Sequence, residues 1–162
     1  MTTYECFSCG ERHDGVPMSW RLEKPDLDPD GNLFEFSREG ELCTVGNHRF
    51  IIANIELPYR GSGKFVWTCW VSLSDASFER INHRWEAADR EDDEPAIGWL
   101  SSILPSYDPT TWALKARVHQ RRVDERPWVE LEPTDHPLAV EQRNGIKGAR
   151  IASIYHAFSE NK

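Results

Sequence analysis

The start of the sequence carries a pair of cysteines whose spacing suits metal binding. Cys6 and Cys9 form a Cys-x2-Cys motif, and Gly10 follows it directly. Two thiolates at this spacing can bind one tetrahedral ion from a tight turn, because glycine lets the backbone bend around the sulfur atoms. A structural zinc site needs four ligands, so the motif alone predicts only half of a site.

Three other residues are candidates for the missing ligands. His13 lies four residues after Cys9. Cys43 and His48 lie in a loop region that could return to the cysteine pair. We predict a structural Zn²⁺ held by Cys6, Cys9, His13 and Cys43. In the alternative set His48 replaces His13, and the sequence does not decide which residue completes the site.

Other interpretations of the cysteine pair stay open. A redox Cys-x2-Cys motif follows a strand and precedes a helix in a βαβ unit, which the sequence does not indicate around residues 6–9. The simplest alternative is two reduced thiols in a turn, with His13 as a surface imidazole. Four protein ligands would make zinc part of the fold, whereas three ligands and an open position would indicate a catalytic metal.

A second group of reactive residue types lies in the segment PTDHPLAVEQRNG, residues 133–145. Asp135 and His136 could act as a general base, with the carboxylate orienting the imidazole ring. Adjacent residues rarely orient one another, however, and Asp135 at a helix start is better explained as an N-cap. Arg143 or Arg117 could bind an anionic substrate. The candidate catalytic residues are therefore His136, Asp135 and Arg143.

The composition is that of an acidic chain of 162 residues, a length typical of one domain. Nineteen Lys and Arg residues stand against 27 Asp and Glu residues, which gives a net charge of −8. Because that balance repels phosphate backbones, we expect no nucleic-acid partner. No apolar run approaches the ~18 residues that span a bilayer, and the first residues do not resemble a signal peptide. We therefore expect no membrane association and a cytoplasmic location.

Two segments alternate between apolar and polar residues, which is the pattern of strands with one buried face. They are RFIIANIEL (49–57) and FVWTCWVSL (65–73), and the Pro- and Gly-containing loop between them predicts a hairpin. The alternation places Cys69 on the apolar face between Trp67 and Val71. There it behaves as a small hydrophobic residue and not as a metal ligand.

A third alternating segment, residues 112–123, carries a basic face. This basic stripe consists of Lys115, Arg117, His119 and Arg121. The segment 127–132 is the expected partner strand, and its Glu130 and Glu132 could oppose the basic stripe. Cross-strand charge pairs contribute only ~0.2–1 kcal/mol each. We interpret the stripe as a paired, solvated sheet face and not as a nucleic-acid site.

Helices are predicted after the second strand and near the C-terminus. Ser74 or Ser77 can cap the first helix, and the acidic run DREDDE (89–94) then indicates a solvated loop. Thr134 or Asp135 can cap a second helix that Asn144-Gly145 ends, and residues 148–159 form a third with one apolar face.

Together these elements predict a single α+β domain over residues 1–162. We expect a mainly antiparallel sheet with helices packed on one face and an N-terminal Cys-x2-Cys knuckle. Residues 1–48 hold the knuckle and a loop region, in which residues 21–48 form at most one short element. Residues 49–132 form the sheet, and residues 133–162 form the helical end.

Six short motifs occur in order along nearly the whole chain. They are CFSCGERH (6–13), ELC (41–43), WVSLS (70–74), GWL (98–100), LPSY (104–107) and HPLAVEQRNGI (136–146). In this order they resemble the bacterial domain-of-unknown-function 2199 family. The family has no established biochemical activity, so the resemblance implies no reaction.

The resemblance does imply which residues this chain shares with the family. They are Cys6, Cys9, His13, Cys43, His136, Gln142 and Gly145. His48 is not part of the family pattern, which favours His13 as the metal ligand. The sequence has Ile-Ile-Ala at 51–53, where the family carries an Arg-Gly pair after an aromatic residue. If a site in the family uses that arginine, it is missing here.

Two classes of function fit these observations. The first is a binding module, in which a zinc-stapled domain recognises another protein. Its acidity suits a basic partner, such as the toxin that an immunity protein or antitoxin binds. The alternative is a small hydrolase or transferase with His136 as acid and base. No phosphate-binding loop, Gly-x-Ser-x-Gly or His-Glu-x-x-His motif occurs, which favours the binding module. Whether the protein is an enzyme stays open.

Overall fold

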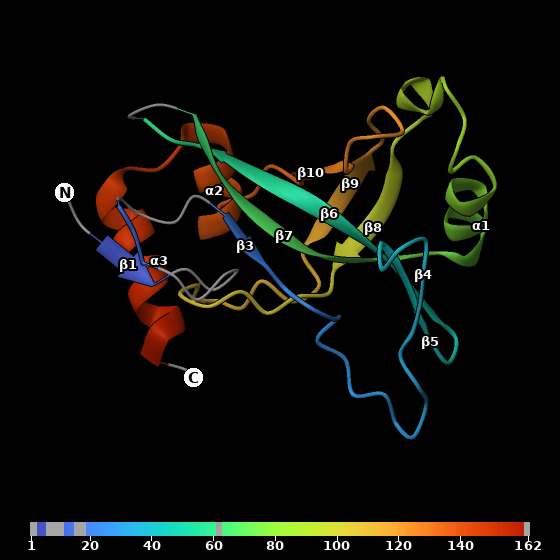
Figure 1. The fold of residues 1–162 in the computed structure, drawn as a ribbon, viewed down its shortest axis with the longest axis horizontal. Coiled ribbons are helices and arrows are strands. Elements are labelled where there is room, and N and C mark those ends of the chain that lie inside the picture. The colour runs from blue at the N-terminus through green and yellow to red at the C-terminus, as the bar shows by residue number, and fades with distance from the viewer. Residues whose placement is uncertain (1–2, 6–11, 15–18, 61–62, 161–162) are drawn as a thin grey trace.

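The structure is a computed structural model, and it describes residues 3–5, 12–14, 19–60 and 63–160. In this part of the chain ten strands and four helices follow one another (Figure 1). The strands are β1 (Thr3–Glu5), β2 (Arg12–Asp14), β3 (Ser19–Arg21), β4 (Glu35–Ser37), β5 (Leu42–Val45), β6 (His48–Pro58), β7 (Lys64–Leu73), β8 (Ala96–Leu100), β9 (Lys115–His119) and β10 (Trp128–Leu131). The helices are α1 (Asp75–His83), the short 3-10 helix η1 (Arg90–Asp92), α2 (Pro137–Asn144) and α3 (Gly148–Glu160).

Five of the strands close into a small barrel. Antiparallel pairs join β6 to β7, β7 to β8, β8 to β9 and β9 to β10. A parallel pair between Trp128 of β10 and Asn54 of β6 completes the ring, and the Asn54 amide donates to the Pro127 carbonyl at 2.9 Å. The α+β class with a mainly antiparallel sheet is confirmed. The closure was not predicted, because a single short parallel contact leaves no periodic signal in the sequence.

Three further strands extend the sheet beyond the barrel. β3 pairs in parallel with β7, whereas β5 and β4 follow β6 in antiparallel order. The prediction of at most one short element in residues 21–48 is therefore wrong, because this segment contains both β4 and β5. Each of these strands has four residues or fewer, too few for alternation to stand out in the sequence.

The long β6–β7 hairpin is buried on both faces. Ile51 and Cys69 point into the barrel core, as the alternation predicts. On the opposite face, Phe50 and Trp70 form a second apolar cluster with Cys43. The segment between β3 and β5 covers this cluster, so a part of the chain predicted as loop has a packing role.

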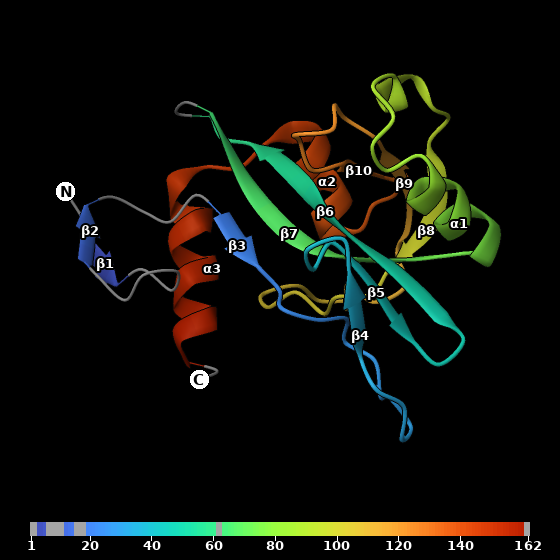
Figure 2. The same cartoon turned by 45° about the vertical axis from the view of Figure 1, so that its right-hand side comes forward.

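The helices cover different parts of the barrel. α1 lies at the opposite end of the molecule from α3 (Figures 1 and 2). Phe78 of α1, Leu138 of α2 and Ile151 of α3 all join the barrel core, so the three helices pack at separate places against the same side of the sheet. Among the described residues, no helix is long and apolar enough to cross a lipid bilayer.

The helix boundaries follow the local sequence signals. The Ser74 hydroxyl accepts from the Ser77 amide and caps α1, as predicted. α2 has Pro137 in its first turn and ends at Gly145. Its N-cap is His136, so the prediction of Thr134 or Asp135 at that position is wrong. The imidazole Nδ1 of His136 accepts the capping hydrogen bond, which the shorter side chain of Thr134 or Asp135 was expected to accept.

Candidate functional site

His136 is buried and both of its ring nitrogens are bonded. Nδ1 accepts from the Leu138 amide at 3.1 Å, which is the N-cap bond of α2. Nε2 lies 2.9 Å from the Pro109 carbonyl and 3.1 Å from the Thr110 carbonyl. A donor faces Nδ1 and acceptors face Nε2, so this pattern fits an imidazole with its proton on Nε2. The geometry therefore supports a structural role for His136, because the ring offers no nitrogen to a substrate.

Gln142 attaches α2 to the barrel, because its side-chain amide forms hydrogen bonds with the backbone of β10 as a neighbouring strand would. Its Oε1 accepts from the Leu131 amide at 2.9 Å, and its Nε2 donates to the Val129 carbonyl at 2.6 Å. Val129 and Leu131 belong to β10, which pairs with β6 only at Trp128. The side-chain amide thus satisfies the two backbone groups that a longer β6–β10 ladder would use.

Gly145 completes this attachment at the C-terminal end of α2. Its φ is +82°, and a Cβ atom added there would lie 2.8 Å from the Pro58 carbonyl oxygen. The next amide, that of Ile146, donates to the same carbonyl at 2.8 Å. We call His136, Gln142 and Gly145 the α2 clamp. The motif that resembled a catalytic segment is thus explained by the attachment of one helix.

A buried polar network lies behind the α2 clamp. The Arg150 Nε of α3 donates to the Glu141 carboxylate at 2.6 Å, and its guanidinium stacks 4.8 Å from the centroid of the Tyr107 ring. The Tyr107 hydroxyl accepts from the indole of Trp67 at 3.0 Å. Burial raises the pKa of Tyr107 above its usual range, and the nearby Glu141 carboxylate acts in the same direction. The phenol is therefore neutral and links α2 and α3 to the barrel core.

The other catalytic candidates do not join His136 in a common site. Asp135 and Arg143 are both exposed, one before α2 and the other in its last turn. Neither side chain makes a hydrogen bond or ion pair with another described residue. The structure therefore does not assemble the acid–base group that the sequence suggested.

The predicted metal ligands fall on different parts of the chain. Cys6 and Cys9 lie outside the described residues, and His13 belongs to the small β1–β2 hairpin. Cys43 is fully buried in β5, and burial raises its pKa to about 11. β5 lies far from β1 and β2 (Figures 1 and 2), so the structure does not bring Cys43 together with that hairpin.

His48 and the remaining described residues give no metal centre either. His48 is exposed at the start of β6 and stacks on Phe50, with 6.3 Å between the ring centroids. Within the described ranges, no group of three or more His, Cys, Asp and Glu side chains could hold a metal ion. The zinc site stays a prediction that rests on the Cys-x2-Cys motif.

A cavity of about 610 Å³ lies beside the end of α1. Its walls come from the β4–β5 turn (residues 38–41), Trp85 and Glu86 after α1, Arg90 of η1, and the loop before β10 (residues 123–127). These segments are distant in the sequence. We call this feature the Trp85 cavity.

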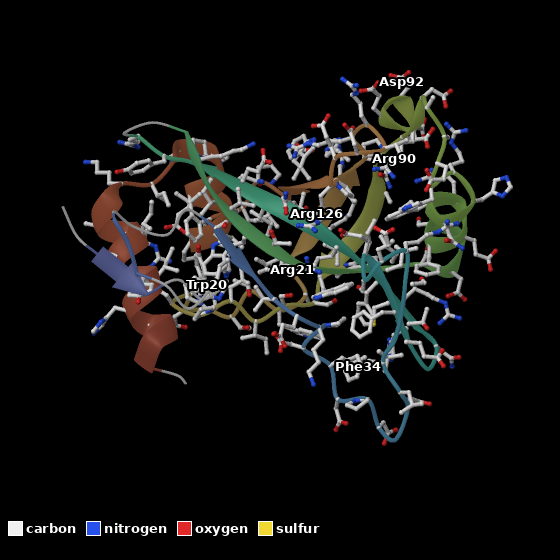
Figure 3. All side chains as sticks on the ribbon, in the orientation of Figure 1. Trp20, Arg21, Phe34, Arg90, Asp92 and Arg126 are labelled. Carbon is white, nitrogen blue, oxygen red and sulfur yellow. The ribbon has the colours of Figure 1, made fainter. Side chains whose placement is uncertain are left out.

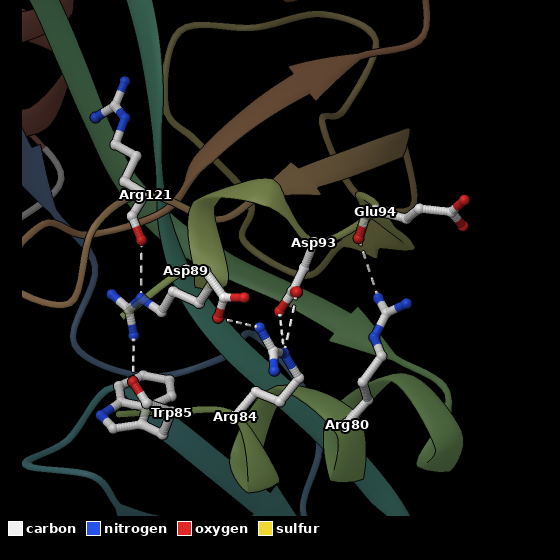
Figure 4. Close-up of polar contacts among 8 residues, drawn as sticks. Arg80, Arg84, Trp85, Asp89, Asp93, Glu94 and Arg121 are labelled. Carbon is white, nitrogen blue, oxygen red and sulfur yellow. Dashed lines mark hydrogen bonds and ion pairs between the residues drawn. The ribbon is translucent and has the colours of Figure 1, made fainter. Parts of the chain in front are cut away.

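Arg90 holds three of these walls together. It is only 3% exposed, and its guanidinium donates to the carbonyls of Trp85 at 2.9 Å and Arg121 at 2.8 Å (Figure 4). Further bonds reach the carbonyls of Arg122, Val123 and Glu125. All partners are backbone oxygens, so one side chain fixes the end of α1 against the loop before β10.

The charge of Arg90 is balanced through space and not by a direct ion pair. Burial lowers the pKa of the Arg90 guanidinium, while the carboxylates of Glu86, Asp124 and Glu41 act in the opposite direction. The guanidinium also lies 5.2 Å from the centroid of the Trp85 ring, where the aromatic face stabilises a cation.

The two other arginines of the Trp85 cavity are also engaged within the protein. Arg126, on the loop before β10 (Figure 3), forms a bidentate pair with Glu41 at 2.8 and 3.0 Å. Arg38 donates to the side chain and the carbonyl of Asn82 at 2.8 and 2.9 Å, and lies 5.9 Å from the Trp85 ring. These two arginines therefore stabilise the walls of the cavity.

The carboxylates of the Trp85 cavity are largely unpaired. The lining includes five carboxylates and three guanidinium groups, a net charge of −2. Glu41 is paired with Arg126. Among the described residues, no ion pair involves the other four carboxylates: Glu39, Glu86, Asp124 and Glu125. The arrangement presents unpaired negative charge along the walls of the cavity, which is suited to a cationic group.

Arg90 could not be recognised from the sequence as an organising residue. It lies inside the acidic run DREDDE, which is typical of a solvated loop. Its five acceptors are backbone carbonyls, four of them in the distant segment 121–125, and a carbonyl carries no residue-type signal.

Sequence comparison relates the chain to known proteins. A family profile described as "Uncharacterized protein conserved in bacteria (DUF2199)" matches residues 5–146. The chain belongs to this family. The DUF2199 match confirms the resemblance seen in the six motifs, and it includes the α2 clamp and all residues of the Trp85 cavity. No curated protein and no solved structure matches the chain.

The α2 clamp gives a first test. Replacing Gln142 with Leu leaves the Leu131 amide and the Val129 carbonyl without partners, so we expect the free energy of unfolding to fall by about 2 kcal/mol. Urea unfolding followed by circular dichroism measures this change. Arg143→Ala is the matched control on the exposed side of α2, with an expected change below about 0.5 kcal/mol. Equal stability of the two variants would contradict the strand-like role of Gln142.

The Arg90 network gives a second test. Lysine keeps the charge but has a single nitrogen, so Arg90→Lys leaves several of these backbone carbonyls without their donor. We expect a loss of about 2–4 kcal/mol in the free energy of unfolding, measured by urea denaturation. Arg80→Lys is the control, because Arg80 is exposed and makes one bond of 3.2 Å to the Glu94 carbonyl (Figure 4). If Arg90→Lys is as stable as the wild type, this network does not hold the walls of the cavity together.

The predicted zinc site is tested by metal content. We expect one zinc per chain in protein purified without a chelator or a His tag, because Cys-x2-Cys motifs in reduced proteins typically hold structural zinc. Elemental analysis of Cys6→Ser should show loss of that metal, together with a lower Tm. Cys69→Ser is the control, because Cys69 lies in the barrel core and should leave the metal content unchanged. Metal-free wild-type protein would contradict the prediction.

Proposed function

We propose that this DUF2199 protein is a protein-binding module that captures a basic segment of its partner at the Trp85 cavity. The observation that carries the proposal is the set of four carboxylates that line the cavity and form no ion pair among the described residues. A lysine or arginine side chain has a cationic end for these carboxylates and an apolar stem for the apolar part of the lining, which includes Trp85, Val123 and Pro127. The acidity of the whole chain favours the same class of partner.

A cationic ligand fits better than an anionic one. Three arginines line the cavity, but Arg90, Arg126 and Arg38 already donate to groups of the protein. An anion would have to compete with those bonds and approach four carboxylates. A cation meets four carboxylates that form no direct ion pair among the described residues, two of which, Glu86 and Asp124, also offset the charge of Arg90 through space. The charge balance therefore favours a basic partner.

The cavity is also held in shape before a ligand arrives. Arg90 joins the end of α1 to the loop before β10, and the Arg126–Glu41 pair joins that loop to the start of β5. Fixed walls reduce the entropy lost on binding, which favours affinity for a short segment. The predicted zinc lies in another part of the chain, and this proposal does not depend on it.

The proposal is tested with a synthetic basic peptide, acetyl-Arg-Gly-Arg-Gly-Arg-amide, and its glutamate counterpart. Titration calorimetry at low salt should detect binding of the basic peptide alone. Neutralising two carboxylates with Glu86→Gln and Asp124→Asn should weaken binding by about tenfold, since each exposed charge pair contributes up to about 1 kcal/mol. Added salt should weaken binding in the same direction.

A matched control separates the site from general attraction to an acidic protein. Glu79→Gln with Glu91→Gln removes the same two charges from exposed positions outside the Trp85 cavity. This variant should bind the basic peptide like the wild type. If both double variants lose the same affinity, the cavity is not the site. If no variant and no wild-type protein binds the basic peptide, the proposed function fails.

A further inference from the structure

The outer face of β8, β9 and β10 has a different character from the rest of the surface. Ile97 and Trp99 of β8 point outward and are 48% and 44% exposed. Ile97 is paired with Arg117, and Trp99 with Lys115, so these four side chains share one face. The protein thus exposes an apolar pair directly beside two cations.

These two cations differ from the other basic residues that follow them in the chain. His119, the next outward residue of β9, lies 3.0 Å from Glu130, and Arg121 forms a bidentate pair with Glu56 at 2.9 Å. Among the described residues, Lys115 and Arg117 make no ion pair. The predicted pairing of the basic stripe is therefore confirmed for His119 and Arg121 and not for Lys115 and Arg117. Glu130, the residue opposite Arg117, is bonded to His119 instead.

A shallow groove runs between the basic and acidic rows of this face. Its volume is about 320 Å³, with Lys115 and Arg117 on the β9 side and Glu130 and Glu132 on the β10 side. One wall is therefore positive and the other negative. Rotation by 180° about an axis along the groove exchanges the two walls. A second copy placed by that rotation puts each basic wall against an acidic one.

We propose that this groove is a self-association surface, at which two copies of the chain form a symmetric dimer. Lys115 and Arg117 of one copy face Glu130 and Glu132 of the other, which makes the interface self-complementary in charge. Ile97 and Trp99 flank the groove and supply apolar surface at its margin. An acidic partner protein fits less well, because it would meet Glu130 and Glu132 as well as the two cations.

Sedimentation velocity over a range of protein concentrations tests the dimer directly. The wild-type protein should pass from monomer to dimer as its concentration rises, and high salt should shift the equilibrium back to monomer. Ile97→Asp should weaken association by at least about tenfold, because it places a carboxylate in an apolar margin. Leu33→Asp is the control, since Leu33 is exposed elsewhere. A wild-type protein that stays monomeric at every concentration overturns the proposal.

Charge reversal separates this groove from any other contact. Lys115→Glu with Arg117→Glu gives two acidic walls, and Glu130→Lys with Glu132→Lys gives two basic walls. All four side chains are exposed, so both variants should fold, which circular dichroism verifies. Each variant alone should be monomeric, whereas an equimolar mixture should form a heterodimer. If the mixture does not associate, the groove is not the interface.

The dimer and the proposed function are independent of each other. None of the groove residues lines the Trp85 cavity. The charge-reversed variants should therefore still bind the basic peptide, and Glu86→Gln with Asp124→Asn should still dimerise. If one proposal fails, the experiment on the other can still be interpreted.

Discussion

The fold depends on a hairpin that must be covered on both of its faces. In the middle of β6, Phe50, Ile51, Ile52 and Ala53 are all buried, although successive side chains of a strand point to opposite sides. A single layer of helices could satisfy only one side. On one face the barrel closes around the core. On the other face, β4, β5 and the segment before them pack against the second apolar cluster. The positions of all other elements follow from this requirement.

The Trp85 cavity is a consequence of that double covering. The β4–β5 turn belongs to the outer cover, whereas the loop before β10 belongs to the barrel. The two meet only at their margins, and α1 ends beside them. The cavity lies where these three segments meet. Arg90 spans the junction with bonds to backbone carbonyls, so the gap has defined walls.

How much the sequence could predict depends on the range of the interaction. Strict alternation identified the inner face of β6 and β7 and placed Cys69 correctly in the core, because each depends on neighbours two residues apart. Helix ends were predictable for the same reason, as with Ser74. Barrel closure at Asn54 and the carbonyl set of Arg90 involve residues that are distant in the sequence and have no type-specific partner.

The role of His136 also depends on contacts with residues that are distant in the sequence. Residue type and an adjacent carboxylate suggested acid–base chemistry, and the sequence could not show that both ring nitrogens meet backbone groups. Those groups belong to the loop before β9 and to the first turn of α2. A histidine that is bonded in this way positions a helix. A motif shared with a family can therefore mark how a helix is attached as readily as a site of chemistry.

The distribution of charge, more than its sum, separates the two surfaces discussed above. Several arginines form ion pairs with carboxylates of the same chain. Arg126 pairs with Glu41, and Arg84 pairs with Asp89 and Asp93 (Figure 4). Once these pairs are set aside, unpaired carboxylates remain around Trp85 and unpaired cations remain on β9. A net charge of −8 predicts neither location. The fold creates both, because it decides which charges find partners within the chain and which are left for another molecule.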